Sequence, residues 1–124
     1  MTKLFVYGTL KSDGALHSLL QNGKFLGEYV TKSKGYAMSS AGGNSFPFVY
    51  YTNPKTNPYR IKGELYEVDP KTLGAAMRTE LSAGYEFKEF DDNIFGFLYP
   101  KAIGSYSNNI QVNDEEKYIE WLNF

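Results

Sequence analysis

The chain has 124 residues, of which 42% are hydrophobic and 22% are charged, a composition that is typical of a globular protein and excludes a disordered one. Thirteen Lys and Arg nearly balance fourteen Asp and Glu, so the net charge of −1 argues against an extended nucleic-acid interface. The sequence has no cysteine and one histidine, His17, which excludes disulfides, thiolate metal sites and a cysteine nucleophile. At this length we expect residues 1–124 to form a single domain.

Alternating apolar residues predict many short strands. Residues 3–7 are apolar in both alternation classes, a pattern that is typical of a strand covered on both faces. The spacing of Leu16, Leu19 and Leu20 predicts a helix that ends before Asn22-Gly23. The other expected strands lie at residues 24–30, 34–38, 46–51, 60–68, 85–90 and 95–99.

Two further helices are expected, which together with the strands indicates an α+β fold. Asp69-Pro70 is a typical helix start, with the helix continuing to about Leu81. Asn113 and Glu116 have the spacing of a capping box for a last helix through Leu122. Turns or loops are expected at residues 39–45, 53–57 and 91–93.

The sequence offers little for targeting, metal or phosphate chemistry. No apolar run is long enough for a signal peptide or a membrane span, so we expect a cytoplasmic protein that does not interact with membranes. The Asp91-Asp92-Asn93 cluster could hold a hard cation, but between two strands it is more typical of a hairpin turn. Gly42-Gly43 lacks the neighbours of a phosphate-binding loop, and His17 has no G-x-S-x-G partner.

Among the acidic residues, Glu80 has the position that best suits catalysis. Leu73, Met77 and Glu80 follow one another at i, i+4 and i+7 of the expected helix, on its apolar stripe. Burial should raise the pKa of such a carboxyl group toward the range of a general acid/base at neutral pH. The alternatives are that Glu80 turns to solvent from the last helical turn or pairs with a lysine.

A second candidate site lies where the first strand ends. The strand stops at Gly8-Thr9, and a glycine there would let a ligand approach exposed backbone N–H groups. The segment Tyr7, Gly8, Thr9 and Leu10, here called the 7–10 turn, could therefore hold an anion or an oxyanion. The alternative is an ordinary connection between a strand and a helix.

These features occur in several blocks that together resemble a known family. V-Y-G-T-L-K at residues 6–11, F-P-F-V at 46–49, G-E-L-Y-E-V-D at 63–69, Glu80 with Tyr85, and G-F-L-Y at 96–99 follow one another in the family's order. The sequence thereby resembles the γ-glutamylcyclotransferase-like proteins, in particular the γ-glutamylaminecyclotransferase or AIG2-like branch. It departs from them before Glu80, where Arg78-Thr79 replaces the usual residues, and at Phe87, where an arginine is usual.

The resemblance implies a small mixed β-barrel with flanking helices and an enzyme that needs no metal or cofactor. Its substrate would be a small γ-glutamyl amide, which cyclises to 5-oxoproline and releases an amine or amino acid. Glu80 would be the catalytic acid/base, and the substrate-binding residues would be Tyr7, Gly8, Thr9, Leu10, Tyr85 and Tyr99.

Two other functions fit parts of the sequence. The altered residues around Glu80 would suit a non-catalytic small-molecule-binding or regulatory protein on the same fold. The 17% aromatic content would suit a single-stranded nucleic-acid binder, which the net charge disfavours. The leaving-group pocket is expected in the loops at residues 39–45 and 53–59; the leaving group itself and the oligomeric state are left open.

Overall fold

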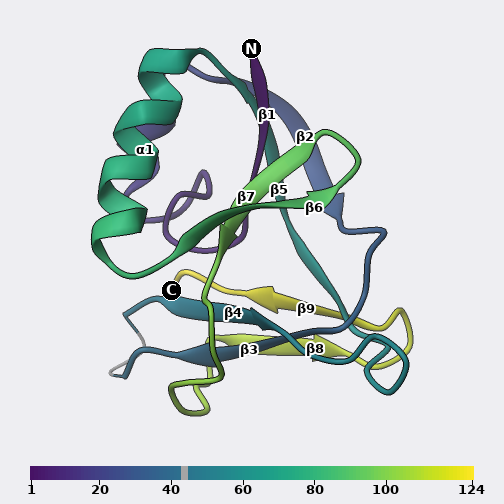
Figure 1. The fold of residues 1–124 in the computed structure, drawn as a ribbon. Helices are drawn as coiled ribbons and strands as arrows, with labels where there is room; N and C mark the ends of the chain where they lie inside the picture. Colours follow the sequence, from purple (N-terminus) through teal and green to yellow (C-terminus); the bar gives the residue numbers. More distant parts are fainter. Residues whose placement is uncertain (43–44) are drawn as a thin grey trace.

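The computed structural model describes residues 1–42 and 45–124, and within them the chain forms nine strands, one α-helix and one short 3-10 helix (Figure 1). Gly43, part of the expected 39–45 loop and of the Gly42-Gly43 pair, lies outside the described residues. The elements are β1 (Thr2–Val6), η1 (His17–Leu20), β2 (Lys24–Val30), β3 (Tyr36–Ser40), β4 (Pro47–Tyr51), β5 (Arg60–Val68), α1 (Pro70–Ser82), β6 (Glu86–Asp91), β7 (Ile94–Leu98), β8 (Ile110–Asn113) and β9 (Tyr118–Trp121).

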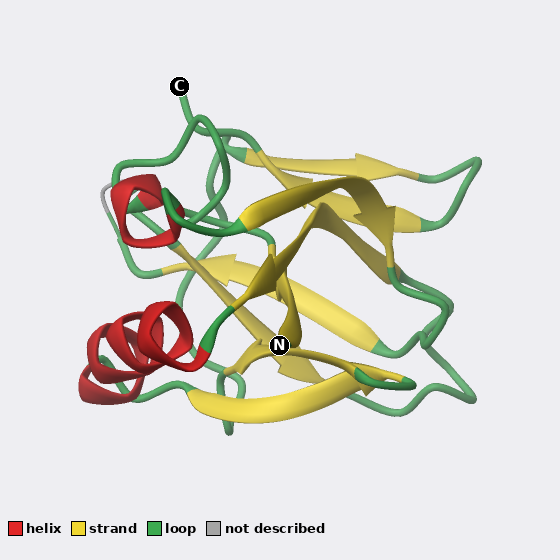
Figure 2. Cartoon of the chain, turned by 90° about the horizontal axis from the view of Figure 1, so that it is seen from above, coloured by secondary structure: helices red, strands yellow, loops and turns green. Residues whose placement is uncertain are grey.

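The described strands form a curled seven-stranded sheet and a separate two-stranded one. The large sheet has the order β6-β7-β1-β5-β9-β8, with β2 paired to the other edge of β5, and the small sheet is the hairpin β3-β4. The α+β prediction is confirmed, although the sheet curls without closing into a barrel. Figure 2 shows both helical segments at the same end of the molecule, with the strands extending away from them.

Strand β1 lies at the centre of the sheet and is buried on both faces, as its sequence predicts. Leu4 and Val6 pack into the core cluster beneath α1, whereas Phe5 and Tyr7 pack into a second cluster that includes Val49 of β4. Leu4 and Phe5 are both fully buried. Since β1 joins two cores, the turn that follows it starts from a rigid position.

Strand β5 changes its partner at Gly63. Residues 64–68 pair antiparallel with β1, and residues 60–62 pair in parallel with β9 on the same edge. A Cβ atom on Gly63 would lie 2.2 Å from the carbonyl oxygen of Val6 and 3.0 Å from the Cα of Tyr7. The end of β1 therefore approaches β5 more closely than any side chain would permit.

Helix α1 begins and ends close to the predicted positions. The Asp69 carboxylate accepts a hydrogen bond from the backbone N–H of Thr72 at 2.7 Å, and Pro70 occupies the first turn. Thr72 and Ala76 are the buried helix residues, and Leu73 and Met77 flank them, partly buried. No helix among residues 1–42 and 45–124 is both long and apolar enough to cross a membrane.

The prediction of a helix after Asn113 is wrong, because this segment forms the hairpin β8-β9. Asn113 does accept the expected hydrogen bond from the N–H of Glu116, at 2.9 Å, but it closes a turn. Lys117 then adopts a φ of 59°, which cannot continue a right-handed helix. In β9, Ile119 and Trp121 are buried while their neighbours are not, which is the period of a strand.

The helix predicted around Leu16–Leu20 is also shorter than expected. Only residues His17–Leu20 form a single 3-10 turn, and Leu20 is its buried residue. The leucine spacing reflects packing of this turn against α1, since Leu16 and Leu19 lie against the same core cluster.

We expect Gly63→Ala to destabilise the fold, because the added methyl group would collide with the backbone of β1. Overpacking of this kind typically costs about 1–3 kcal/mol in the free energy of unfolding, measured by urea denaturation. Gly74→Ala is the matched control: its Cβ would meet only the flexible end of Arg78, at 3.6 Å. That helix substitution should stabilise the protein by up to about 1 kcal/mol, and equal effects of both substitutions would contradict the close approach at Gly63.

Candidate active site

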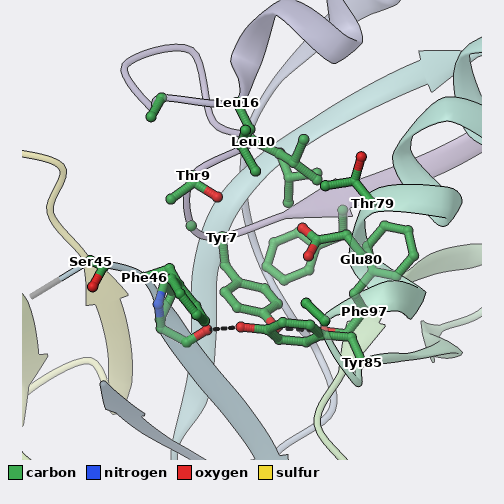
Figure 3. A pocket seen from close by; sticks show the side chains of 16 residues that line it. Tyr7, Thr9, Leu10, Leu16, Ser45, Phe46, Thr79, Glu80, Tyr85 and Phe97 are labelled. Carbon is green, nitrogen blue, oxygen red and sulfur yellow. Dashed lines mark hydrogen bonds between the residues drawn. The ribbon is translucent and has the colours of Figure 1, made fainter. Parts of the chain in front are cut away.

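A cavity of about 280 Å³ opens between the end of β1 and the end of α1 (Figure 3). This volume lies just below the usual range for small-molecule sites, about 300–1,000 Å³, and therefore suits a small ligand. Both features singled out by the sequence, the 7–10 turn and Glu80, line it. We call it the Glu80 cavity. The residues that line it are Phe5, Val6, Tyr7, Gly8, Thr9, Leu10, Ala15, Leu16, Ser45, Phe46, Pro47, Thr79, Glu80, Ala83, Tyr85 and Phe97.

Glu80 occupies the last turn of α1, and its carboxyl group points into the cavity, toward the side on which Tyr7 and Thr9 lie (Figure 3). Within the described part of the chain, no group donates a hydrogen bond to this carboxyl and no lysine or arginine forms an ion pair with it. Burial therefore raises the pKa of Glu80 from its ordinary 4.5 to about 7. At neutral pH the group can both accept and donate a proton.

Tyr7 and Tyr85 form an aromatic wall beside Glu80. The Tyr7 hydroxyl donates to the carbonyl oxygen of Phe97 at 2.6 Å, and the Tyr85 hydroxyl donates to the carbonyl oxygen of Pro47. Burial raises the pKa of both phenols, and the nearby Glu80 carboxylate adds to the rise. Both hydroxyl protons are held by backbone carbonyls, so these residues shape the cavity and are not free to exchange protons with a ligand.

The 7–10 turn lines the cavity and carries three backbone N–H groups that have no acceptor among the described residues. The carbonyl of Gly8 accepts from the N–H of Lys11 at 3.1 Å, and the carbonyl of Thr9 accepts from the N–H of Leu16 at 2.9 Å. The N–H groups of Gly8, Thr9 and Leu10 donate to no acceptor among the described residues. Buried backbone donors are rarely left unpaired, so this turn is suited to bind the oxygen atoms of a ligand.

The position of the turn depends on Gly8. A Cβ atom there would lie 2.8 Å from Cγ of Pro47, so the absence of a side chain lets the turn pack directly against the start of β4. Pro47 also supplies the carbonyl that holds Tyr85. Pro47 thus contacts both the 7–10 turn and Tyr85, which form two walls of the cavity.

The side chains that line the Glu80 cavity include no lysine, arginine or histidine. Arg78 is exposed on the outer side of α1, next to Glu80 in the sequence but outside the lining. His17 also lies outside, with Nδ1 3.1 Å from the carbonyl oxygen of Leu10, where it supports the turn from behind. A negatively charged part of a ligand would therefore be bound by uncharged donors, the backbone N–H groups of the turn and the hydroxyl groups of the lining.

Of the predicted binding residues Tyr85 and Tyr99, only one lines the cavity. Tyr85 lines the cavity, whereas Tyr99 lies behind it, with its ring 5.3 Å from that of Tyr85 and 4.5 Å from that of Phe48. Residues 53–59 do not line the cavity or the polar hollow beside it. That hollow is lined by Thr9, Asp13, Gly14, Ala15, Ser45, Asn109, Asn123 and Phe124.

Sequence reasoning missed several lining residues. Thr79 precedes Glu80, and Ala15 and Leu16 come from the loop before η1, where no motif distinguishes them from packing residues. Phe46 and Pro47 belong to a block that the sequence did single out, but only their contact with Gly8 and Tyr85 places them at the site.

Chemically, the arrangement combines one proton carrier with a row of hydrogen-bond donors. Among the described lining residues there is no cysteine, lysine or histidine, so the hydroxyl groups of Thr9, Ser45 and Thr79 have no imidazole beside them to activate them as nucleophiles. Such a site suits a reaction in which the ligand supplies its own nucleophile.

Solved structures share this fold. A protein from Pyrococcus horikoshii superposes with a TM-score of 0.67 at 27% identity, covering 85% of this chain and 84% of that chain. An AIG2-like protein from Mus musculus superposes with a TM-score of 0.63 at 26% identity, covering 87% of this chain and 80% of that chain.

Sequence relatives give the same result. A Methanocaldococcus jannaschii protein provisionally named gamma-glutamylcyclotransferase is 45% identical over 74 residues, and the Pyrococcus horikoshii protein, with the same provisional name, is 32% identical over 87 residues. The aligned segments cover 59% and 70% of this chain, and 56% and 66% of the relatives' own lengths. Residues 4–96 match the family described as "Gamma-glutamyl cyclotransferase, AIG2-like", which includes both the 7–10 turn and Glu80. The chain belongs to this AIG2-like gamma-glutamyl cyclotransferase family.

Proposed function

We propose that this protein is a γ-glutamyl cyclotransferase that converts a small γ-glutamyl amide into 5-oxoproline and a free amine or amino acid. The α-amine of the glutamyl group attacks its own γ-carbonyl carbon, a carbon–nitrogen bond forms within a five-membered ring, and the original amide bond breaks. The proton lost by the attacking nitrogen is transferred to the leaving nitrogen, so the reaction needs no other reactant.

The observation that carries the proposal is the shared cavity of Glu80 and the 7–10 turn. An unpaired carboxyl group with a pKa of about 7 can take the proton from the α-amine and return it to the leaving nitrogen. The N–H groups of Gly8, Thr9 and Leu10 can bind glutamyl oxygens and stabilise the negative charge that develops on the γ-carbonyl oxygen.

Steric and electrostatic properties of the lining support the same assignment. The aromatic wall of Tyr7 and Tyr85 restricts the cavity to a folded, compact glutamyl chain, which brings the two reacting atoms together. The Glu80 carboxylate also attracts the α-ammonium group of an incoming substrate, and no cation of the lining competes for it.

Replacement of Glu80 by Gln keeps the size of the side chain and removes its ability to carry a proton. We expect turnover of a γ-glutamyl amide, followed as 5-oxoproline release, to fall by about 10²–10⁴-fold. Binding of 5-oxoproline should change little, because the backbone donors of the 7–10 turn remain in place. Glu86→Gln is the control, since Glu86 is exposed and pairs only with Lys88, and its turnover should match that of the wild type. Full activity of a folded Glu80→Gln protein would remove Glu80 as the acid/base.

The raised pKa of Glu80 also makes stability depend on pH. Between about pH 4.5 and 7 the folded chain keeps a proton on Glu80 that the unfolded chain loses, so the free energy of unfolding falls as the pH rises through this window. The loss amounts to at most about 3 kcal/mol. Glu80→Gln lacks this contribution and should gain stability relative to the wild type between pH 5 and pH 8 in urea denaturation. A stability difference that is the same at both pH values would show that the pKa of Glu80 is not raised.

A further inference from the structure

The carbonyl group of Gly8 accepts two hydrogen bonds, one from the backbone N–H of Lys11 at 3.1 Å and one from a side chain far along the chain. Asn123 donates from Nδ2 to the Gly8 carbonyl oxygen at 3.1 Å and to Oδ1 of Asp13 at 3.0 Å. Its Oδ1 accepts from Nε1 of Trp121 at 3.1 Å. Because an indole N–H can only donate, this contact fixes which end of the Asn123 amide faces Gly8.

The anchor of this network is rigid. Trp121 is 1% exposed and ends β9, which pairs with β5 in the centre of the sheet. Lys11, itself buried, donates from Nζ to the carbonyl oxygen of Trp121 at 2.6 Å. Two side-chain hydrogen bonds thus connect the segment that carries the 7–10 turn to the end of β9. Lys11 donates to Trp121, and Asn123 donates to Gly8.

The bond to Gly8 sets the direction of a neighbouring donor. In a trans peptide the C=O of one residue and the N–H of the next point in opposite directions, and the described chain has no cis peptide. Asn123 lines the polar hollow and not the Glu80 cavity, Gly8 lines the cavity and not the hollow, and Thr9 lies between the two and lines both. A Gly8 carbonyl held toward Asn123 therefore directs the N–H of Thr9 away from the hollow.

We propose that Asn123 is a positioning residue that orients the Gly8-Thr9 peptide so that the Thr9 N–H donates into the Glu80 cavity. The proposal deepens the function given above and rests on it for the identity of the ligand. It assigns a role to a residue that lies outside the family match at residues 4–96 and outside the lining of the cavity. Asn123 touches no substrate and acts only through the backbone.

The orientation of the peptide can be measured without any ligand. Residual dipolar couplings of the Thr9 N–H, in NMR spectra of the 15N-labelled protein, report the direction of that bond. We expect the coupling to change in Asn123→Ala and in Asn123→Asp, while the couplings of β5 stay as in the wild type. Asn123→Asp keeps the shape and the acceptor for Trp121 but has no N–H to donate, and because its carboxylate would lie beside that of Asp13, it is made together with Asp13→Ala. Asp13→Ala is the control, because it removes the other partner of the same amide and leaves the bond to Gly8 intact.

Binding of 5-oxoproline gives the functional readout. We expect the dissociation constant to rise by about tenfold in both Asn123 variants and by less than twofold in Asp13→Ala, with unchanged melting temperatures confirming that the variants fold. The pH dependence of turnover should keep the wild-type midpoint, since Asn123 lies outside the lining that surrounds Glu80. A merely structural role would lower the melting temperature and leave the Thr9 coupling of the folded protein unchanged.

The two proposals fail in different ways. A wild-type Thr9 coupling in both Asn123 variants overturns the positioning role, whatever the protein binds. If the coupling changes but wild-type protein neither binds 5-oxoproline nor releases it from a γ-glutamyl amide, the positioning role stands and the proposed function is wrong.

Discussion

The candidate site depends on keeping one carboxyl group, that of Glu80, partly buried and without a partner among the described residues. A lysine or arginine beside Glu80, or a hydroxyl donating to it, would hold the pKa of this group low and leave a carboxylate too weakly basic for proton transfer at neutral pH. The hydroxyl groups of Tyr7 and Tyr85, which line the same cavity, donate instead to the carbonyl oxygens of Phe97 and Pro47. The rest of the fold must therefore offset the cost of desolvating Glu80, which the two aromatic-rich cores on either side of β1 can do.

An unpaired carboxyl group and an unpaired row of backbone donors are complementary. A γ-glutamyl group carries an ammonium group and several acceptor oxygens, so it can satisfy both at once. Since the donors belong to the backbone of the 7–10 turn, their strength does not depend on a charged side chain that would perturb Glu80. The packing of Gly8 against Pro47 fixes the position of this turn, and with it the position of its backbone donors.

Local signals in the sequence predicted the elements that bear the chemistry. The two-sided apolar pattern of β1 and the Asp69-Pro70 start of α1 are short-range features, and the spacing from that start places Glu80 at the helix end. The β8-β9 hairpin was missed because Asn113 makes the same hydrogen bond in a turn as in a helix cap. Pairing of β9 with β5, in which Tyr118 lies opposite Arg60, 58 residues earlier in the chain, is a long-range contact that favours the strand and that local patterns do not show. For the same reason, no pattern could show that Tyr99 lies behind Tyr85 or that Asn123 reaches Gly8.

The family match contains the 7–10 turn and Glu80 but not all of the groups that hold them in place. Residues 4–96 contain the 7–10 turn and Glu80, whereas the carbonyl of Phe97, the indole of Trp121 and the amide of Asn123 come from beyond that segment. The Phe97 carbonyl accepts from the Tyr7 hydroxyl, and the Trp121 indole holds the Asn123 amide, which donates to the Gly8 carbonyl. These later groups act on the site only through the groups that they hold. Glu80, the proposed proton carrier, and Gly8, where a side chain would collide with Pro47, both lie within the match, so the matched segment contains the two positions on which the proposed chemistry directly depends.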